Sequence, residues 1–221
     1  MGGAAVFVLI GLVIAGVIAI ALYLDYLRKE FWRKVAARYG LTYSPGDPLD
    51  VAGRYPFSLL QQGHSRRTSN TVHGEYGGRP VVLFDYTYKT GSGKNQSTHS
   101  LSALIVEMPL LGCALSVRPE NFLDRFASFL GFDDINFELE QFNRAFRVNC
   151  ESKKFAYDVF HTGMMEFMLT HPRACFEWQG HAMLITYGQC QFDEAKVDDA
   201  LETARGFVER LPNFLLTEAK G

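Results

Sequence analysis

The residues best suited to chemistry are two histidines and one aspartate in the strand-rich part of the chain. Asp85 lies between two aromatic residues, and His73 and His99 lie in the neighbouring strand-like segments. If the histidines faced each other across adjacent strands, with the carboxylate nearby, they would form an acid–base or metal-binding group of the kind that hydrolases use. We favour the alternative, in which the histidines are surface residues and Asp85 is a half-buried carboxylate paired with Arg79 or Arg147.

Other sequence patterns predict no cofactor site and no metal site. The segment Gly91–Lys94 resembles part of a phosphate-binding loop, but the Walker pattern needs Gly at position 88 and Ser or Thr at position 95, where this chain has Tyr88 and Asn95. No two histidines are four residues apart, no Cys/His cluster has zinc spacing, and no nucleophile elbow occurs. We interpret the four cysteines as small core residues. They are Cys113, Cys150, Cys175 and Cys190.

A long apolar segment near the start of the chain precedes these candidates. Ala4–Leu24 contains no charged side chain, and as a helix it would be about 31 Å long, close to the ~30 Å hydrocarbon core of a bilayer. We therefore expect residues 1–25 to be a single transmembrane anchor, with the lipid bilayer as a partner. The alternatives are a buried core helix and a signal peptide cleaved after residue 21. The segment 19–21 (Ala-Ile-Ala) favours cleavage, whereas the absence of basic residues before the apolar run opposes it.

Basic residues follow the apolar segment and predict its orientation. Because cytoplasmic flanks are enriched in Lys and Arg, we expect the N-terminus outside the cell and the rest of the chain in the cytoplasm. Residues 25–94 carry 11 basic and 6 acidic side chains, whereas residues 95–221 carry 11 and 18. We expect the basic side chains near the membrane to face anionic lipid. These are Arg28, Lys29, Arg33, Lys34, Arg38, Arg66 and Arg67. The chain lacks the basic domain that nucleic-acid binding needs.

The pattern divides the remaining chain into three parts. Residues 26–40 are expected to form a juxtamembrane amphipathic helix, because apolar residues recur at helical spacing and Gly40 can end it. Residues 41–70 read as a linker, with a turn at Pro45–Pro48 and a polar stretch before residue 71. Residues 71–216 are predicted to be an α+β cytoplasmic domain.

Within that domain we predict a mostly antiparallel sheet and a C-terminal amphipathic helix. The order of strands and the closing helix favour a pleckstrin-homology-like barrel, although the predicted helices at 152–170 depart from that pattern. The expected strands are Val72–Tyr76, Arg79–Lys89, Ser97–Met108, Cys113–Val117, Asn136–Leu139 and Ala145–Cys150, followed by a hairpin over Cys175–Tyr187. The expected helices are Phe122–Leu130, Ser152–Phe160, Thr162–Thr170 and Asp193–Leu211.

Four short segments resemble an uncharacterised family of bacterial membrane-anchored proteins, known only as a domain of unknown function. They are Gly74–Val81, Phe84–Tyr86, Phe142–Val148 and Met164–Glu166. The resemblance covers roughly residues 39–212. It implies a bacterial, membrane-tethered α+β domain, and it supplies no catalytic residue.

These observations leave three functional hypotheses. The leading one is a membrane-tethered, noncatalytic binding or scaffold module with a protein partner at the membrane. A methionine-rich stripe at residues 164–168 is either part of its core or an adaptable protein-binding face. The alternatives are a domain that binds anionic lipid headgroups through its basic residues, and a membrane-anchored hydrolase that uses His73, His99 and Asp85.

Overall fold

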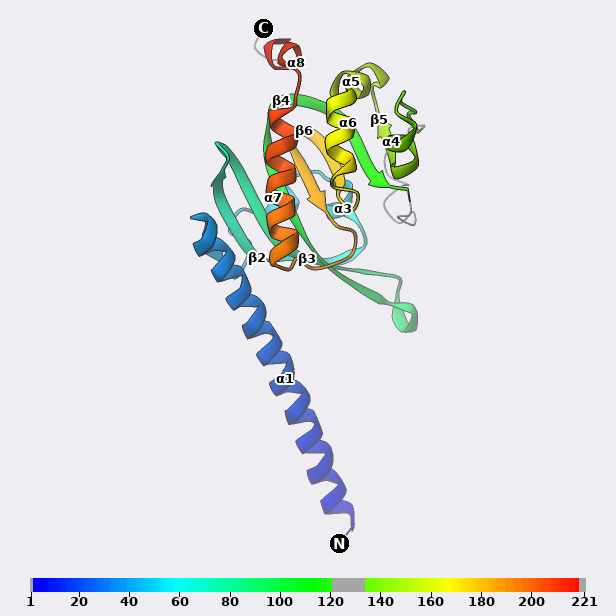
Figure 1. The fold of residues 1–221 in the computed structure, drawn as a ribbon. Helices are drawn as coiled ribbons and strands as arrows, with labels where there is room; N and C mark the ends of the chain where they lie inside the picture. Colours follow the sequence, from blue (N-terminus) through cyan, green and yellow to red (C-terminus); the bar gives the residue numbers. More distant parts are fainter. Residues whose placement is uncertain (1, 121–133, 219–221) are drawn as a thin grey trace.

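The computed structural model describes residues 2–120 and 134–218, and it has the α+β class that the sequence predicts. A long N-terminal helix leads into a domain built on a mostly antiparallel sheet, with further helices packed against it (Figure 1). In chain order the elements are α1 (Gly2–Tyr39), β1 (Thr42–Ser44), α2 (Val51–Arg54), α3 (Ser58–Gln61), β2 (His64–Tyr76), β3 (Arg79–Thr90), the 3-10 turn η1 (Gly93–Asn95), β4 (Ser97–Pro119), α4 (Glu140–Ala145), β5 (Phe146–Cys150), α5 (Lys153–Val159), α6 (Thr162–Leu169), β6 (Cys175–Thr186), α7 (Glu194–Glu209) and α8 (Asn213–Glu218).

Helix α1 has two parts with different surroundings. Its large apolar side chains from Phe7 to Leu27 are exposed on every side of the helix, so this part is not the core helix of a soluble domain. By length and composition it is a candidate membrane span. Nearer its C-terminal end, Trp32, Val35 and Ala36 are buried in the core of the domain. One 38-residue helix, about 57 Å long, therefore runs without a break from the apolar segment into the domain.

The sheet has the strand order β1-β2-β3-β4-β5. Strand β6 also pairs with β4, along the edge opposite to the one that β5 occupies. All of these strand pairs are antiparallel. Side chains alternate between the two faces along β3. Val81 and Leu83 belong to the larger core, which also holds residues of α1 and α7, whereas Phe84, Tyr86 and Tyr88 belong to a smaller core on the opposite face.

Three strands, β2, β4 and β6, are longer than the sequence predicts, and β2 begins at His64 instead of Val72. The expected strands 97–108 and 113–117 form the single strand β4, and the expected hairpin over 175–187 is the single strand β6. Irregular pairing between Glu107 and Leu115 interrupts the alternation of side chains without ending the strand, and Gly112 pairs with Gly180 there. The sheet is open, because in the described chain β1 pairs with β2 and with neither β5 nor β6, so the barrel that we expected does not form.

The segment that we expected to be a linker, residues 41–70, belongs to the folded domain. It contains β1, α2, α3 and half of β2. Val51, Phe57 and Leu60 are fully buried in the smaller core, where they cover the face of the sheet that α1 and α7 leave open. The linker interpretation was wrong because these apolar residues have neither helical nor strand periodicity, yet they fill a surface that would otherwise be exposed to water.

The helices that follow β4 agree with the prediction more closely than the strands do. Ser152 caps α5 by accepting a hydrogen bond from the backbone N–H of Phe155, and Asp193 caps α7 in the same way from Lys196. Met164, Met165 and Met168 are buried, so the methionine stripe is part of the core. The expected strand at 136–139 is absent from the described chain, where the side chain of Asn143 instead binds both backbone groups of Phe137. The expected helix 122–130 lies outside the described residues.

Replacing Gly112 by alanine is expected to destabilise the domain by about 1–3 kcal/mol. A Cβ atom at this position would lie 2.4 Å from Cε2 of Trp178, whose buried indole N–H donates to the carbonyl oxygen of Gly180 at 2.9 Å. Urea unfolding of the full-length chain in non-ionic detergent measures the change. The matched control is Gly46→Ala, which meets no atom within 4 Å. Equal stability of the two variants would contradict this packing at the irregularly paired part of β4.

Candidate functional site

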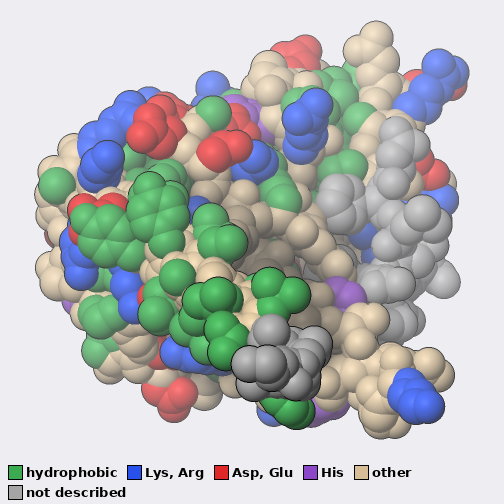
Figure 2. Space-filling view, turned by 90° about the horizontal axis from the view of Figure 1, so that it is seen from below, with side chains coloured by type: hydrophobic (Ala, Val, Ile, Leu, Met, Phe, Trp, Pro, Cys, Tyr) green, Lys and Arg blue, Asp and Glu red, His purple; other side chains and the backbone are tan. Residues whose placement is uncertain are grey.

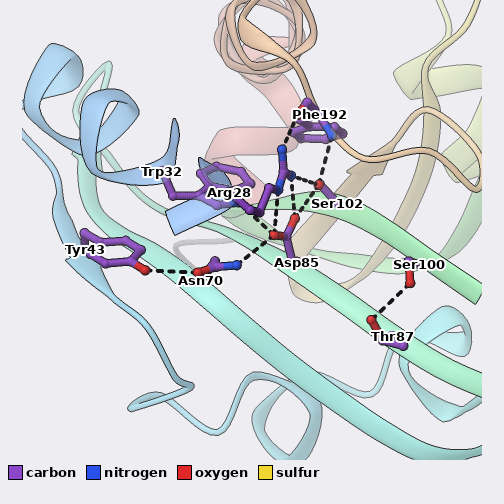
Figure 3. A network of polar contacts seen from close by, with 9 residues as sticks. All are labelled: Arg28, Trp32, Tyr43, Asn70, Asp85, Thr87, Ser100, Ser102 and Phe192. Carbon is purple, nitrogen blue, oxygen red and sulfur yellow. Dashed lines mark hydrogen bonds and ion pairs between the residues drawn. The ribbon is translucent and has the colours of Figure 1, made fainter. Parts of the chain in front are cut away.

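The carboxylate of Asp85 is the centre of a polar cluster between α1 and the sheet (Figure 3). Its Oδ1 accepts hydrogen bonds from Nη2 of Arg28 and Oγ of Ser102, both at 2.6 Å. Its Oδ2 accepts from Nε of Arg28 at 2.9 Å, Nε1 of Trp32 at 2.9 Å and Nδ2 of Asn70 at 3.0 Å. We call these five residues, Arg28, Trp32, Asn70, Asp85 and Ser102, the anchor clamp.

The anchor clamp also holds the loop between β6 and α7. Nη1 of Arg28 donates to the carbonyl oxygen of Phe192 at 2.7 Å, and the backbone N–H of Phe192 donates to Oγ of Ser102 at 2.9 Å. Nη2 of Arg28 also donates a hydrogen bond to Oγ of Ser102, at 2.8 Å. Three segments that are distant in sequence, namely α1, the sheet and the β6–α7 loop, therefore meet at one ion pair (Figure 3).

Local structure explains why these side chains converge. Arg28 and Trp32 are four residues apart on α1, so they lie on the same side of the helix. Ser102 on β4 is directly opposite Asp85 on β3, so their side chains share a face of the sheet. Asn70 adopts a left-handed backbone conformation, with φ of 52°, at an irregularity of β2, and its side-chain oxygen accepts a hydrogen bond from the hydroxyl of Tyr43.

The hydrogen bonding of Asp85 opposes a catalytic role. The residue is 4% exposed, and its two oxygens together accept five hydrogen bonds. A carboxylate offers about four lone-pair positions, so none remains to receive a proton from a substrate. The two-pronged contact with Arg28 is the geometry of a strong charge-assisted pair. The cluster is therefore suited to fixing α1 against the domain.

The two candidate histidines do not meet. His73 lies opposite Val82 and His99 lies opposite Tyr88, so they are separated by about 20 Å along β3. His99 stacks on the ring of Tyr88, on the opposite face of the sheet from Asp85, and its ring nitrogens contact Thr90 and Gln189. Within residues 2–120 and 134–218, no group of three or more His, Cys, Asp or Glu side chains is placed to hold a metal ion.

The candidate lipid-facing residues have varied surroundings. Arg28 lies in the anchor clamp, so the expectation that it faces lipid was wrong, and the reason is the buried carboxylate that the sequence does not place beside it. Most of the others have partners within the protein. Lys29 pairs with Asp25, Arg33 with Glu30, and Arg38 with Asp198, and Arg66 donates to Gln61. Lys34 and Arg67 are exposed.

A second polar site, which we call the α7 pocket, was not predicted from the sequence. It has a volume of about 590 Å³ and lies between the α6–β6 loop, the β6–α7 loop and the first turns of α7. Within it, Asp199 accepts hydrogen bonds from Tyr187 and from Nδ1 of His171, the latter at 2.7 Å. The hydrogen bond from His171 holds the pKa of Asp199 below its usual value. No sequence motif indicated this pocket, because its walls come from three separate segments.

Comparison with known proteins identifies a related fold. No family model matches the sequence, and no curated protein matches it. Among solved structures, the crystal structure of the mycobacterial trehalose monomycolate transport factor A, TtfA, is similar to this chain, with a TM-score of 0.61 and 12% sequence identity. The similarity covers 83% of this chain and 96% of that chain. At this level of identity, the likeness establishes a shared fold.

Proposed function

We propose that this chain is a membrane-tethered, noncatalytic binding module whose domain is held in a fixed position on the membrane surface. The observation that carries this proposal is the anchor clamp. A flexible tether would only keep the domain near the membrane, whereas the Arg28–Asp85 pair joins the membrane-spanning helix to the sheet directly. Such a connection would present the same face of the domain to a partner at all times.

The geometry of α1 supports a close approach to the bilayer. Arg28 follows Leu24, the last residue of the apolar segment, by four positions, or about 6 Å along a helix. The β6–α7 loop, which Arg28 contacts, would then lie at the level of the lipid headgroups. Viewed from the N-terminal end of α1, the domain presents both basic and acidic side chains around that helix (Figure 2).

The fold comparison supports a noncatalytic role. TtfA is named as a transport factor, and its fold covers most of this chain. By analogy with that name, our proposal is that the domain of the present protein is an accessory to membrane transport. In this role it would bind a protein in the same membrane. We further propose that the N-terminus is outside the cell and the domain in the cytoplasm, on the basis of the basic residues that follow the apolar segment.

Cross-linking of the full-length chain in its native membrane tests this function. We expect one membrane protein to be enriched with the wild-type chain and with a chain whose residues 4–24 are replaced by an unrelated apolar helix. We expect its recovery to fall several-fold when a flexible Gly-Ser segment is inserted between Leu24 and Asp25, because the domain keeps its tether and its packed part of α1 but its orientation on the membrane is no longer fixed. Mass spectrometry of the cross-linked proteins measures the recovery. A wild-type sample without an enriched membrane protein would contradict the proposal.

A further inference from the structure

The α7 pocket has the size and the walls of a small-molecule site. Its volume of about 590 Å³ lies within the range of about 300–1,000 Å³ that is typical of ligand sites. Polar side chains of His171, Arg173, Tyr187 and Lys196 line it together with two aspartates. All of these residues belong to the described part of the chain, and none belongs to the anchor clamp.

The charges in the pocket leave one cation available. Asp193 accepts a hydrogen bond from the backbone N–H of Lys196 at 2.9 Å and also pairs with its ammonium group, and Asp199 is bound by His171 and Tyr187. Both carboxylates are therefore engaged by their own neighbours. Arg173 is exposed, and within residues 2–120 and 134–218 it has no hydrogen-bond or ion-pair partner.

An available guanidinium favours one class of ligand. Arginine binds phosphate through two parallel N–H···O bonds, and it is the side chain most suited to that geometry. The ammonium of Lys196 lines the same pocket but is paired with Asp193, whose carboxylate also caps the N-terminal end of α7, so the guanidinium of Arg173 is the positive group left for a ligand. This guanidinium selects an anion, and a phosphate ester matches its two-pronged geometry best.

The position of the pocket indicates where such a ligand comes from. Tyr187, Cys190 and Asp193 form one wall, and they flank Phe192, whose carbonyl oxygen is bound by Arg28 at 2.7 Å. The wall of the pocket is thus held by the residue that lies about 6 Å beyond the apolar segment. In the membrane-tethered chain, this loop would lie beside the headgroup layer.

We infer that the α7 pocket binds the phosphate-bearing headgroup of a membrane phospholipid, with Arg173 as the residue that contacts the phosphate. The inference rests on the proposed membrane tether for the source of the ligand. The same chemistry would also accept free phosphate, so the experiment must separate the two sources. Of the basic residues that we expected from the sequence to face lipid, Arg28 holds a wall of this pocket and none lines it.

Calorimetric titration of the full-length chain in non-ionic detergent tests the inference with three probes: short-chain phosphatidylglycerol, inorganic phosphate and short-chain diacylglycerol. We expect saturable binding of phosphatidylglycerol, weaker binding of inorganic phosphate, and none of diacylglycerol. Arg173→Ala should weaken phosphatidylglycerol binding about tenfold or more, because it removes a charge-assisted contact. The matched control is Arg144→Ala, which removes the same charge from an exposed arginine on α4 that pairs with Glu140.

Three results would overturn the inference. The first is the absence of binding by both phosphate probes. The second is an equal loss of affinity in Arg173→Ala and Arg144→Ala, which would show attraction to general surface charge. The third is equal affinity for inorganic phosphate and phosphatidylglycerol, which would make free phosphate the ligand. The titration needs no protein partner, so it can succeed even if the cross-linking experiment fails.

Discussion

Asp85→Ala is expected to lower the free energy of unfolding by about 3–5 kcal/mol, because it leaves the guanidinium of Arg28 without its buried counter-charge. The variant also removes the acceptor of the Trp32 and Asn70 donors, both of which are buried. Urea unfolding of the full-length chain in non-ionic detergent, followed by tryptophan fluorescence, measures the change.

Two further variants show whether the ion pair itself is responsible. The double variant Arg28→Met, Asp85→Leu removes both charges and keeps apolar volume, so we expect it to recover much of the lost stability. Glu140→Ala breaks the exposed pair with Arg144 and should change stability by at most about 0.5 kcal/mol. If Asp85→Ala lowered the free energy of unfolding as little as Glu140→Ala, the anchor clamp would not hold α1 to the domain.

The sequence indicated that Asp85 is a structural carboxylate, but not which residue pairs with it. An acidic residue between aromatic residues in a strand needs a partner when it is buried, and that physical argument was sufficient to favour pairing over catalysis. The expected partners, Arg79 and Arg147, were chosen from the same domain. The actual partner, Arg28, belonged to a basic cluster that membrane topology already explained, so nothing in the sequence called for a second role.

The same reasoning explains which parts of the fold were predictable. Caps such as Ser152 and the apolar stripe of α7 are local signals, and the structure confirms them. Long-range features carried no local signal. The irregular pairing along β4 includes Gly112 opposite Gly180 on a strand distant in sequence, and the packing of residues 51–60 depends on a face of the sheet that other elements leave uncovered. The α7 pocket likewise exists only after three segments come together.

The clamp and the buried part of α1 make the anchor a structural element of the domain. Trp32 is fully buried and packs in the larger core with residues of β2 and β3. Further along the helix, the hydroxyl of Tyr39 donates to Asp198 on α7, and burial together with this hydrogen bond raises the pKa of Tyr39 to about 12. Both the sheet and α7 therefore contact the segment that the sequence presented as a separate juxtamembrane helix.

A chain that begins at Leu41 is accordingly expected to be unstable, whereas a chain that begins at Asp25 should fold. Loss of residues 25–40 leaves a cavity in the core where Trp32 packs. Loss of a buried tryptophan side chain alone typically lowers the free energy of unfolding by about 3–5 kcal/mol. It also leaves Asp85 buried without Arg28, which adds a cost of similar size. Together these losses approach the whole stability of a typical domain, about 5–15 kcal/mol.

Circular dichroism and urea unfolding of the two soluble chains, 25–221 and 41–221, measure this difference. We expect a cooperative transition for the longer chain and a weak or absent transition for the shorter one. Adding Trp32→Ala to the longer chain should lower its stability part of the way toward that of the shorter chain. Tyr26→Ala, at a position that is 55% exposed, should leave its stability unchanged. Equal stability of the two chains would mean that α1 contributes only a membrane anchor, and the fixed position on the membrane that we propose for this domain would lose its structural basis.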